Sequence, residues 1–311
     1  AYDIKGIKVK LPSNYNGYDP ETLQVGDNLY EGHWDGQLTK LGWTSNPAWI
    51  FYDLVTNERY GLGGYIKGTQ IDKWTLYQVA RYCDSVNEDG DFVGVKTGFR
   101  DAVTGEDMYE PRFAMNLYIQ QQQEAIKVIQ DIAFAFRGLV YWAAGQLVPV
   151  QDAPKTASKL FSAANVIDGA FQYTGTAQKA RKTVALVSWN DPEDMYRAKM
   201  EYVEDREGID RYGIRKTSIT SFGCTSRGQA HRIGLWTLFT NRLETELLAF
   251  KTGIEAAALR PGDLVLIADP TRAGKRLGGR TKVVEESSKT RVYLDVPFTP
   301  TGGVDYTLNI L

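Results

Sequence analysis

The chain has 311 residues, 43% of them hydrophobic, with 36 basic and 38 acidic side chains and a formal net charge of −2. This length allows two or three domains. The balanced charge gives no support to a nucleic-acid-binding surface, and no run approaches the roughly 18 apolar residues of a membrane-spanning helix. Because the chain starts with Ala1 rather than Met, and ends at Leu311 just after a strand pattern, we expect a piece of a longer polypeptide.

Residues 1–41 carry strand patterns at both ends, which predict a β segment. Two helices with clear start signals follow. Asn46 is a good N-cap, and Pro47 takes the first helical position, where a missing N–H costs nothing. Asp72 caps a second helix that extends to about Ser85.

The other patterns within residues 42–155 alternate between strand and helix. They are a polar hairpin (86–109), a strand (112–119), a helix (120–136) with Ile126 on its apolar face, and a hairpin (139–150) that turns near Ala144. Together with the two capped helices they predict a compact α+β domain over 42–155.

The helix predicted over 226–243 has a specific start signal. Ser226 followed three positions later by Gln229 is a capping box, in which each side chain satisfies a free backbone N–H group. Three apolar residues at helical spacing should then face a core: Ala230, Ile233 and Trp236.

This helix belongs to a second, β-rich α+β domain predicted over 156–252. Beyond it, short strand patterns at near-regular spacing predict a small β-barrel-like domain over 253–311. The expected fold class is therefore α+β, with several domains and a small C-terminal barrel.

The residues that could carry chemistry form no recognisable motif. Cys224 and His231 are seven positions apart, about 10 Å along a helix, whereas a nucleophile and its base need a separation of about 3 Å. The only other histidine is His33, so zinc ligands are too few. The two cysteines are too few for a disulfide scaffold, and we expect both thiols to be free, with Cys83 in a core.

Three further features favour ordinary structural roles. Asn87, Asp89 and Asp91 alternate like the start of a calcium loop, but the EF-hand pattern is not completed. The glycines at 61–64 and 278–279 lack the frame of a phosphate-binding loop. The basic segment 271–282 is expected to be a solvated hairpin loop, with contact to an acidic partner or to DNA as the alternative. No catalytic, cofactor-binding or metal site is therefore predicted.

Eight blocks of sequence, in this order along the chain, have unusual wording: LPSNYN (11–16), WDG (34–36), RYG (59–61), DKWTLYQVARYCD (72–84), EPRF (110–113), VQDAP (150–154), VEDREGIDRYG (203–213) and FGCTSRGQAHRIGLW (222–236). They resemble the equivalent blocks of the tail-tip attachment proteins, or host-specificity proteins, of lambda-like bacteriophages. The resemblance covers roughly the first 240 residues and corresponds to the N-terminal-to-middle hub region of that family.

The resemblance implies a non-enzymatic structural part of the distal tail tip of a phage or prophage. Such a hub links the tail tube to the receptor-binding fibre, for host attachment and DNA delivery. The resemblance also implies that the β segment 1–41 belongs to or leads from a hub barrel. The implied partners are two further copies in a homotrimer, other distal tail proteins, the tape-measure protein and the DNA in transit, with the host receptor contacted only by downstream regions. The implied location is the virion tail tip, after assembly in the bacterial cytoplasm. A tail-associated glycan-binding module or depolymerase is the alternative.

Overall fold

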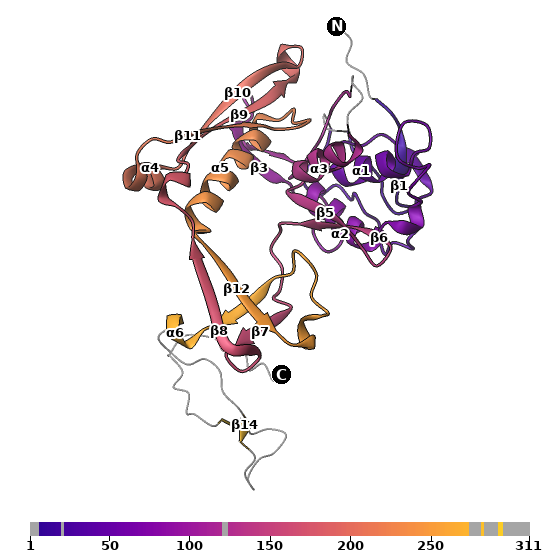
Figure 1. The fold of residues 1–311 in the computed structure, drawn as a ribbon. Helices are drawn as coiled ribbons and strands as arrows, with labels where there is room; N and C mark the ends of the chain where they lie inside the picture. Colours follow the sequence, from indigo (N-terminus) through magenta and orange to yellow (C-terminus); the bar gives the residue numbers. More distant parts are fainter. Residues whose placement is uncertain (1–5, 20–21, 120–123, 274–280, 283–291, 295–311) are drawn as a thin grey trace. The chain divides into compact units, whose positions relative to one another are not determined.

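The computed structural model describes residues 6–19, 22–119, 124–273, 281–282 and 292–294, and the chain divides into two units (Figure 1). Unit 1 comprises Ala1–Asp152 and Gln178–Glu244, and unit 2 comprises Ala153–Ala177 and Thr245–Leu311. The chain therefore crosses between the units three times. The four consecutive segments predicted above, with boundaries at 41, 155 and 252, do not include this interleaving and stay a prediction.

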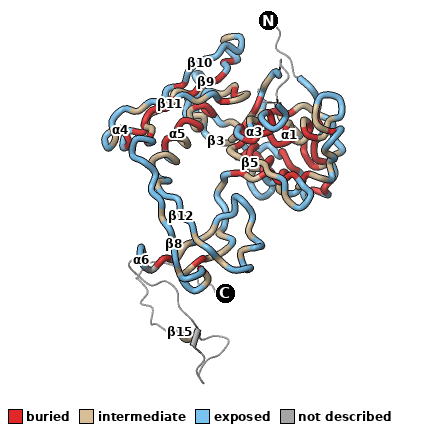
Figure 2. The backbone as a smooth tube through the Cα atoms, in the orientation of Figure 1, coloured by how far each residue is buried: buried red, intermediate tan, exposed pale blue. Residues whose placement is uncertain are grey.

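The first half of unit 1 is built from three helices and two short antiparallel sheets. Its elements are β1 (Val9–Leu11), β2 (Lys40–Gly42), α1 (Pro47–Thr56), α2 (Lys73–Asp84), α3 (Ala125–Ala135), β5 (Gly138–Ala143) and β6 (Gln146–Gln151). Fully buried side chains such as Trp49, Phe51 and Leu76 form its core, seen as the buried stretches of Figure 2.

Both predicted caps of this half are confirmed. The Asn46 side chain accepts a hydrogen bond from the Ala48 N–H at 2.9 Å, with Pro47 at the first helical position of α1. Asp72 accepts from the Thr75 N–H at 3.1 Å and starts α2. These contacts satisfy backbone donors that a helix start leaves free.

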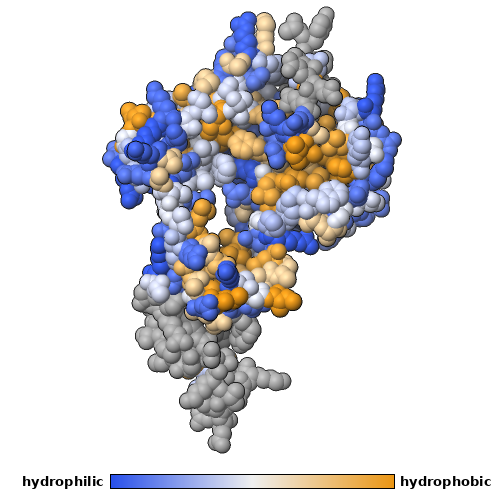
Figure 3. All heavy atoms as spheres, in the orientation of Figure 1, coloured by the Kyte–Doolittle hydropathy of each residue, from blue (hydrophilic) through white to orange (hydrophobic). Residues whose placement is uncertain are grey.

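Two expectations for this half need correction. The segment 112–119 forms no strand, and α3 begins only at Ala125. Ile126 is 56% exposed rather than buried, because the buried face of α3 is set by Ile129, Ile132 and Ala133. Phe134 of α3 and Leu139 and Trp142 of β5 are also exposed, and Figure 3 shows apolar surface on unit 1.

The predicted hairpin between α2 and α3 is confirmed as β3 (Val95–Arg100) and β4 (Asp107–Glu110). The second half of unit 1 contains β9 (Val184–Asp191), β10 (Arg197–Glu204), α4 (Arg206–Tyr212), β11 (Lys216–Thr220) and α5 (Arg227–Leu243). The sheet order is β10-β9-β11, antiparallel on one side of β9 and parallel on the other.

Helix α5 covers one face of this sheet. Its buried residues Ala230, Ile233 and Leu238 share a core with Val187 and Val203 of the strands. A Cβ atom at Gly234 would lie 2.6 Å from Val203 Cγ2, so glycine allows α5 to pack this closely.

Unit 2 consists of short strands that pair two by two. They are β7 (Lys159–Ser162) with β13 (Val265–Ala268), β8 (Val166–Gly175) with β12 (Glu246–Thr252), and β14 (Thr281–Lys282) with β15 (Tyr293–Leu294). The helix α6 (Pro270–Ala273) follows β13. Short 3₁₀ helices of the two units are η1 (Gly68–Gln70), η2 (Gln178–Ala180), η3 (Pro192–Asp194) and η4 (Ile254–Ala256).

The mixed α+β class is thereby confirmed at the level of elements. Within the described ranges the strands of unit 2 close no barrel. The strand pattern predicted over 305–310, and most of the basic segment 271–282, lie outside the described residues. Of the helices in the described part of the chain, none has the length and apolar character needed to cross a bilayer.

Candidate functional site

The two halves of unit 1 are joined along residues 113–116, which we call the junction segment. Its backbone N–H groups donate to three different places: Phe113 to Cys83 O at 3.1 Å, Met115 to Ser45 O at 2.8 Å, and Asn116 to Gly223 O at 2.8 Å. These partners do not belong to one neighbouring strand. The alternating pattern that predicted a strand over 112–119 therefore belongs to a segment that connects two cores, and not to a strand of a sheet.

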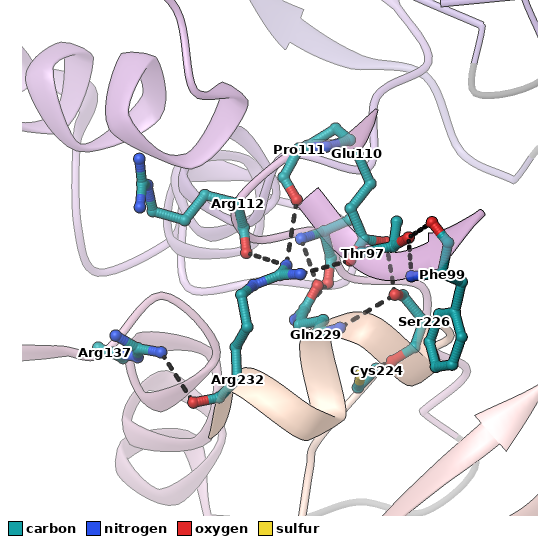
Figure 4. Close-up of polar contacts among 11 residues, drawn as sticks. Thr97, Phe99, Glu110, Pro111, Arg112, Arg137, Cys224, Ser226, Gln229 and Arg232 are labelled. Carbon is teal, nitrogen blue, oxygen red and sulfur yellow. Dashed lines mark hydrogen bonds and ion pairs between the residues drawn. The ribbon is translucent and has the colours of Figure 1, made fainter. Parts of the chain in front are cut away.

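Gln229 of α5 completes the hydrogen bonding of the junction segment. Its Oε1 accepts from the Ala114 N–H at 2.9 Å, and its Nε2 donates to the Ala114 carbonyl oxygen at 3.1 Å (Figure 4). The side-chain amide thus pairs with the backbone as a neighbouring strand would. Gln229 is only 2% exposed, so both bonds lie in a buried environment.

The predicted capping box at α5 is only half formed. Ser226 Oγ accepts from the Gln229 N–H at 3.1 Å, as expected for the N-cap. The Gln229 side chain does not return to Ser226, because it bonds Ala114 instead. The glutamine of the motif therefore joins α5 to the junction segment rather than capping the helix.

Glu110, at the end of β4, receives two more hydrogen bonds from α5. Arg232 Nη1 donates to its Oε1 at 2.6 Å, and Ser226 Oγ donates to its Oε2 at 2.5 Å. The two charged side chains are largely buried, with 21% of Arg232 and 17% of Glu110 exposed. We call Glu110, Ala114, Ser226, Gln229 and Arg232 the clamp, since together they join α5 to the first half of unit 1.

Gly228 lets α5 approach the hairpin within the clamp. A Cβ atom at this position would lie 2.8 Å from Thr97 O, 3.0 Å from Thr97 Cα and 2.6 Å from Glu110 Oε1. Two of these atoms belong to the backbone of β3 and cannot rotate away. Glycine is therefore required for the close contact between α5 and β3.

Trp236 lies one turn beyond Arg232 and is half-buried, whereas Ala230 and Ile233 are buried as predicted. Its indole Nε1 donates to Asp152 Oδ2 at 2.9 Å. A tryptophan with a polar partner at the edge of a core uses both its apolar ring and its N–H. The helical spacing could not predict this hydrogen bond, because Asp152 lies 84 positions away in the sequence.

Cys224 and His231 do not bond each other in the structure. The Cys224 thiol donates to Ser226 O at 3.2 Å, and burial raises the pKa of this thiol, which favours the unreactive protonated form. His231 Nδ1 lies 3.1 Å from Glu201 Oε1, and Glu201 also bonds Arg227 at 2.7 Å. Both cysteines are buried free thiols.

A buried carboxyl group, which the sequence pattern did not single out, lies at the end of α2. Asp84 has no exposed surface and accepts a hydrogen bond from Tyr30 OH at 2.7 Å. Its Oδ1 has no hydrogen-bond partner. Burial raises the pKa of Asp84 from 3.8 to about 7, although hydrogen bonds from neighbouring side chains act in the opposite direction.

The acidic loop around Asp91 is organised by amide side chains. Asn28 and Asn87 donate to the two carboxylate oxygens of Asp91 at 2.7 and 3.3 Å, while Asp89 is exposed. His33 is also exposed. Among the residues that the structure describes, no group of three or more His, Cys, Asp or Glu side chains could hold a metal ion.

The family of putative phage tail proteins matches residues 124–281, and the chain belongs to this family. Within it, the chain is similar to Tip attachment protein J of Escherichia phage SECphi27, at 40% identity over 293 residues, and of Escherichia phage SECphi4, at 36% over 279 residues. These matches confirm the resemblance described above.

The alignments cover 93% and 89% of this chain but 22% of each relative, so the chain spans about a fifth of the length of the curated relatives it matches. Among solved structures, a tail protein from Neisseria meningitidis MC58 shows 14% identity and a TM-score of 0.32, over 52% of this chain and 49% of that chain. That similarity is too low to support an argument about the fold.

Proposed function

We propose that this chain is a structural part of the distal tail tip of a phage or prophage. It corresponds to a hub that links the tail tube to the receptor-binding fibre. The observation that carries the proposal is the similarity to two tip attachment proteins along about nine-tenths of the chain. In this proposal three copies surround the tail axis and contact other distal tail proteins, including the tape-measure protein, and the phage DNA passes through.

The chemistry of unit 1 supports a structural role. Its most elaborate polar cluster, the clamp, joins a helix to a hairpin and to the junction segment, and its members bond one another. The Cys224 thiol is buried, with a raised pKa, so it is not prepared for nucleophilic attack. The names of the two relatives refer to attachment rather than to a reaction.

The direct test is to image phage particles that carry an epitope tag on this chain. We expect antibody-gold to label one end of the tail, the end that contacts the cell. Label along the tail shaft or on the head would contradict the tail-tip proposal. Tagged particles must first be shown to adsorb normally, so that the tag itself does not displace the protein.

The assembly state of the isolated 311-residue chain gives a second test. We expect a monomer or a weak trimer by light scattering, since a ring subunit also depends on neighbouring tail proteins, and interfaces below roughly 1,000 Å² seldom persist alone. A tight symmetric dimer would contradict the ring arrangement.

A further inference from the structure

Two arginines beside the clamp are half-buried without a carboxylate partner. The Cζ atom of Arg112 lies 4.4 Å from the centroid of the Tyr82 ring, and the Nη2 of Arg112 donates to Ser85 Oγ at 3.4 Å. Arg137 lies over the rings of Phe113 and Trp236, at 5.2 and 5.3 Å. Its Nη2 donates to Arg232 O at 3.2 Å. Within the described ranges neither arginine forms an ion pair, and the Nε of each is buried with no hydrogen-bond partner.

The charges around this pair do not cancel. Arg232 is a third guanidinium and bonds Glu110, while Asp152 accepts from the Trp236 indole. Among these five side chains, three cations and two carboxylates leave one positive charge. Asp84, which directly precedes Ser85, has its pKa raised to about 7 by burial, so in the folded chain it retains its proton below pH 7. Burial lowers the pKa of Arg137 to about 10, repulsion from Arg232 and Arg112 acts in the same direction, and attraction to Asp152 acts against it.

Such an arrangement costs the isolated chain stability. A partly buried cation loses hydration, and this loss is repaid only when a counter-charge and good hydrogen bonds are present. Places where a sequence departs from this rule are characteristic of functional surfaces. Figure 4 draws Arg112 and Arg137 on the flank of Arg232 that faces away from Ser226, so the clamp does not occupy them.

We propose that Arg112 and Arg137 bind the carboxylate of an aspartate or glutamate from another protein chain. Each guanidinium lies against an aromatic ring, and the terminal amino groups of a guanidinium can donate paired hydrogen bonds to a carboxylate. One carboxylate neutralises the one excess charge. A nucleic-acid backbone brings many phosphates, which Glu110 and Asp152 repel. The inference deepens the proposed function, because it gives the hub a contact point for a neighbouring tail protein.

The test uses the 311-residue chain and two capped peptides, a triglutamate and a triglutamine, with inorganic phosphate as a third probe. The arginine Nε–H resonances are followed by NMR and assigned with the variants Arg112→Met and Arg137→Met. We expect triglutamate, but not triglutamine or phosphate, to shift both resonances. Arg137→Met should weaken triglutamate binding about tenfold or more, as loss of a charged hydrogen bond does.

A matched control is Arg211→Met, since Arg211 also lies over an aromatic ring, that of Tyr212 at 5.3 Å, but is exposed. This variant should bind triglutamate normally. The midpoint of thermal unfolding should stay unchanged or rise in Arg137→Met. If the midpoint instead falls strongly and triglutamate does not bind the unchanged chain, Arg137 has a purely structural role and the inference is wrong. Equal or tighter binding of phosphate would also overturn the assignment to a protein carboxylate.

A second arm separates this inference from the proposed function. If tagged chain labels the tail tip, and Arg137→Met enters particles and binds triglutamate as the unchanged chain does, only the carboxylate site is wrong. If triglutamate binds through Arg137 but no label is found on tails, the site stands and the tail-tip role fails.

Discussion

Glu110 is bonded by Ser226, the N-cap of α5, and by Arg232, which lies in the second turn of the helix. Glu110→Gln should therefore weaken both contacts and leave the Arg232 charge without its partner. We expect the free energy of unfolding to fall by about 1–3 kcal/mol, the range for lost charged hydrogen bonds at partly buried sites. Urea-induced unfolding followed by circular dichroism measures this change.

Glu58→Gln is the matched control for that substitution. Glu58 also pairs with a basic residue, Lys67 at 3.0 Å, but 76% of its side chain is exposed. An exposed pair contributes little, because water and salt screen it. If the two variants lowered stability equally, the clamp would not be a special contact.

Asp84 predicts a pH dependence of stability. Its folded-state pKa is raised by burial to about 7, from an ordinary value of 3.8. Between about pH 4 and pH 7 the folded chain therefore retains a proton that the unfolded chain has lost. The stabilisation that comes from this bound proton is fully present below pH 3.8, and it is lost as the pH rises to about 7, the pKa of Asp84 in the folded chain.

Asp84→Asn should remove this dependence. We expect the variant to gain stability relative to the unchanged chain by about 1.4 kcal/mol for each pH unit between pH 5 and pH 7, and to gain no more above pH 7. Urea unfolding at several pH values measures the slope. Asp89→Asn, at an exposed position, serves as the control. Parallel stability curves for the Asp84 variant and the unchanged chain would show that Asp84 is already charged in the folded state.

At the scale of elements, the sequence predicted correctly those helices and hairpins whose stabilising contacts are between residues close together in the chain. The caps of α1 and α2 and the hairpin β5–β6 fall close to their predicted positions, because their partners are near in sequence. The strand predicted over 112–119, which includes the junction segment, was wrong. Its hydrogen bonds reach Cys83, Ser45 and residues near 223, and no short-range pattern reports such partners.

The clamp could be predicted only in part from the sequence, because its contacts also join residues that are distant in the chain. Ser226 and Gln229 were found through the capping motif, yet the main contact of Gln229 is Ala114, 115 positions away. Glu110 and Arg232 fall in conspicuous blocks of the sequence, but nothing in those blocks indicates that the two side chains pair. Strand β7 and helix α4 are too short to produce a periodic pattern and were missed.

The contact of α5 with β3 can be tested through Gly228. Glycine to alanine in a helix normally stabilises it by about 0.5–1 kcal/mol. Here the added Cβ meets backbone atoms of Thr97 at 2.8 and 3.0 Å, so we expect Gly228→Ala to lower stability, by about 1–3 kcal/mol as for other overpacked sites. The midpoint of thermal denaturation gives the sign.

Gly64→Ala is the comparison variant, since a Cβ there would meet nothing within 4 Å. It should leave the midpoint near that of the unchanged chain. A stabilised Gly228→Ala variant would mean that α5 and β3 are further apart in solution than the structure places them.

At the scale of the whole molecule, the eight sequence blocks identified the protein family, whereas composition and charge only excluded other classes of protein. The family assignment also leads to a prediction about host range. We expect receptor choice to reside outside residues 1–311, because the described part of unit 1 consists of capped helices and paired strands that build a scaffold. Exchanging this region between two phages of different host range should leave host range unchanged or abolish tail assembly.

Exchanging the receptor-binding fibre between the two phages should instead transfer the host range. Plating efficiency on the two hosts measures both exchanges. A change of host range from the 1–311 exchange alone would contradict the scaffold role and would direct attention to the polar segment 86–109 and the basic segment 271–282.

The interleaving of the two units has a consequence for protein synthesis. Strand β8 ends at Gly175, but its partner β12 starts only at Glu246, after the whole second half of unit 1 has been made. At the usual rate of about 5–20 residues per second, β8 leaves the ribosome several seconds before its partner. During that interval its edges are open to strands of neighbouring nascent chains. Slower translation between these two strands should therefore increase the fraction of newly made protein found in aggregates.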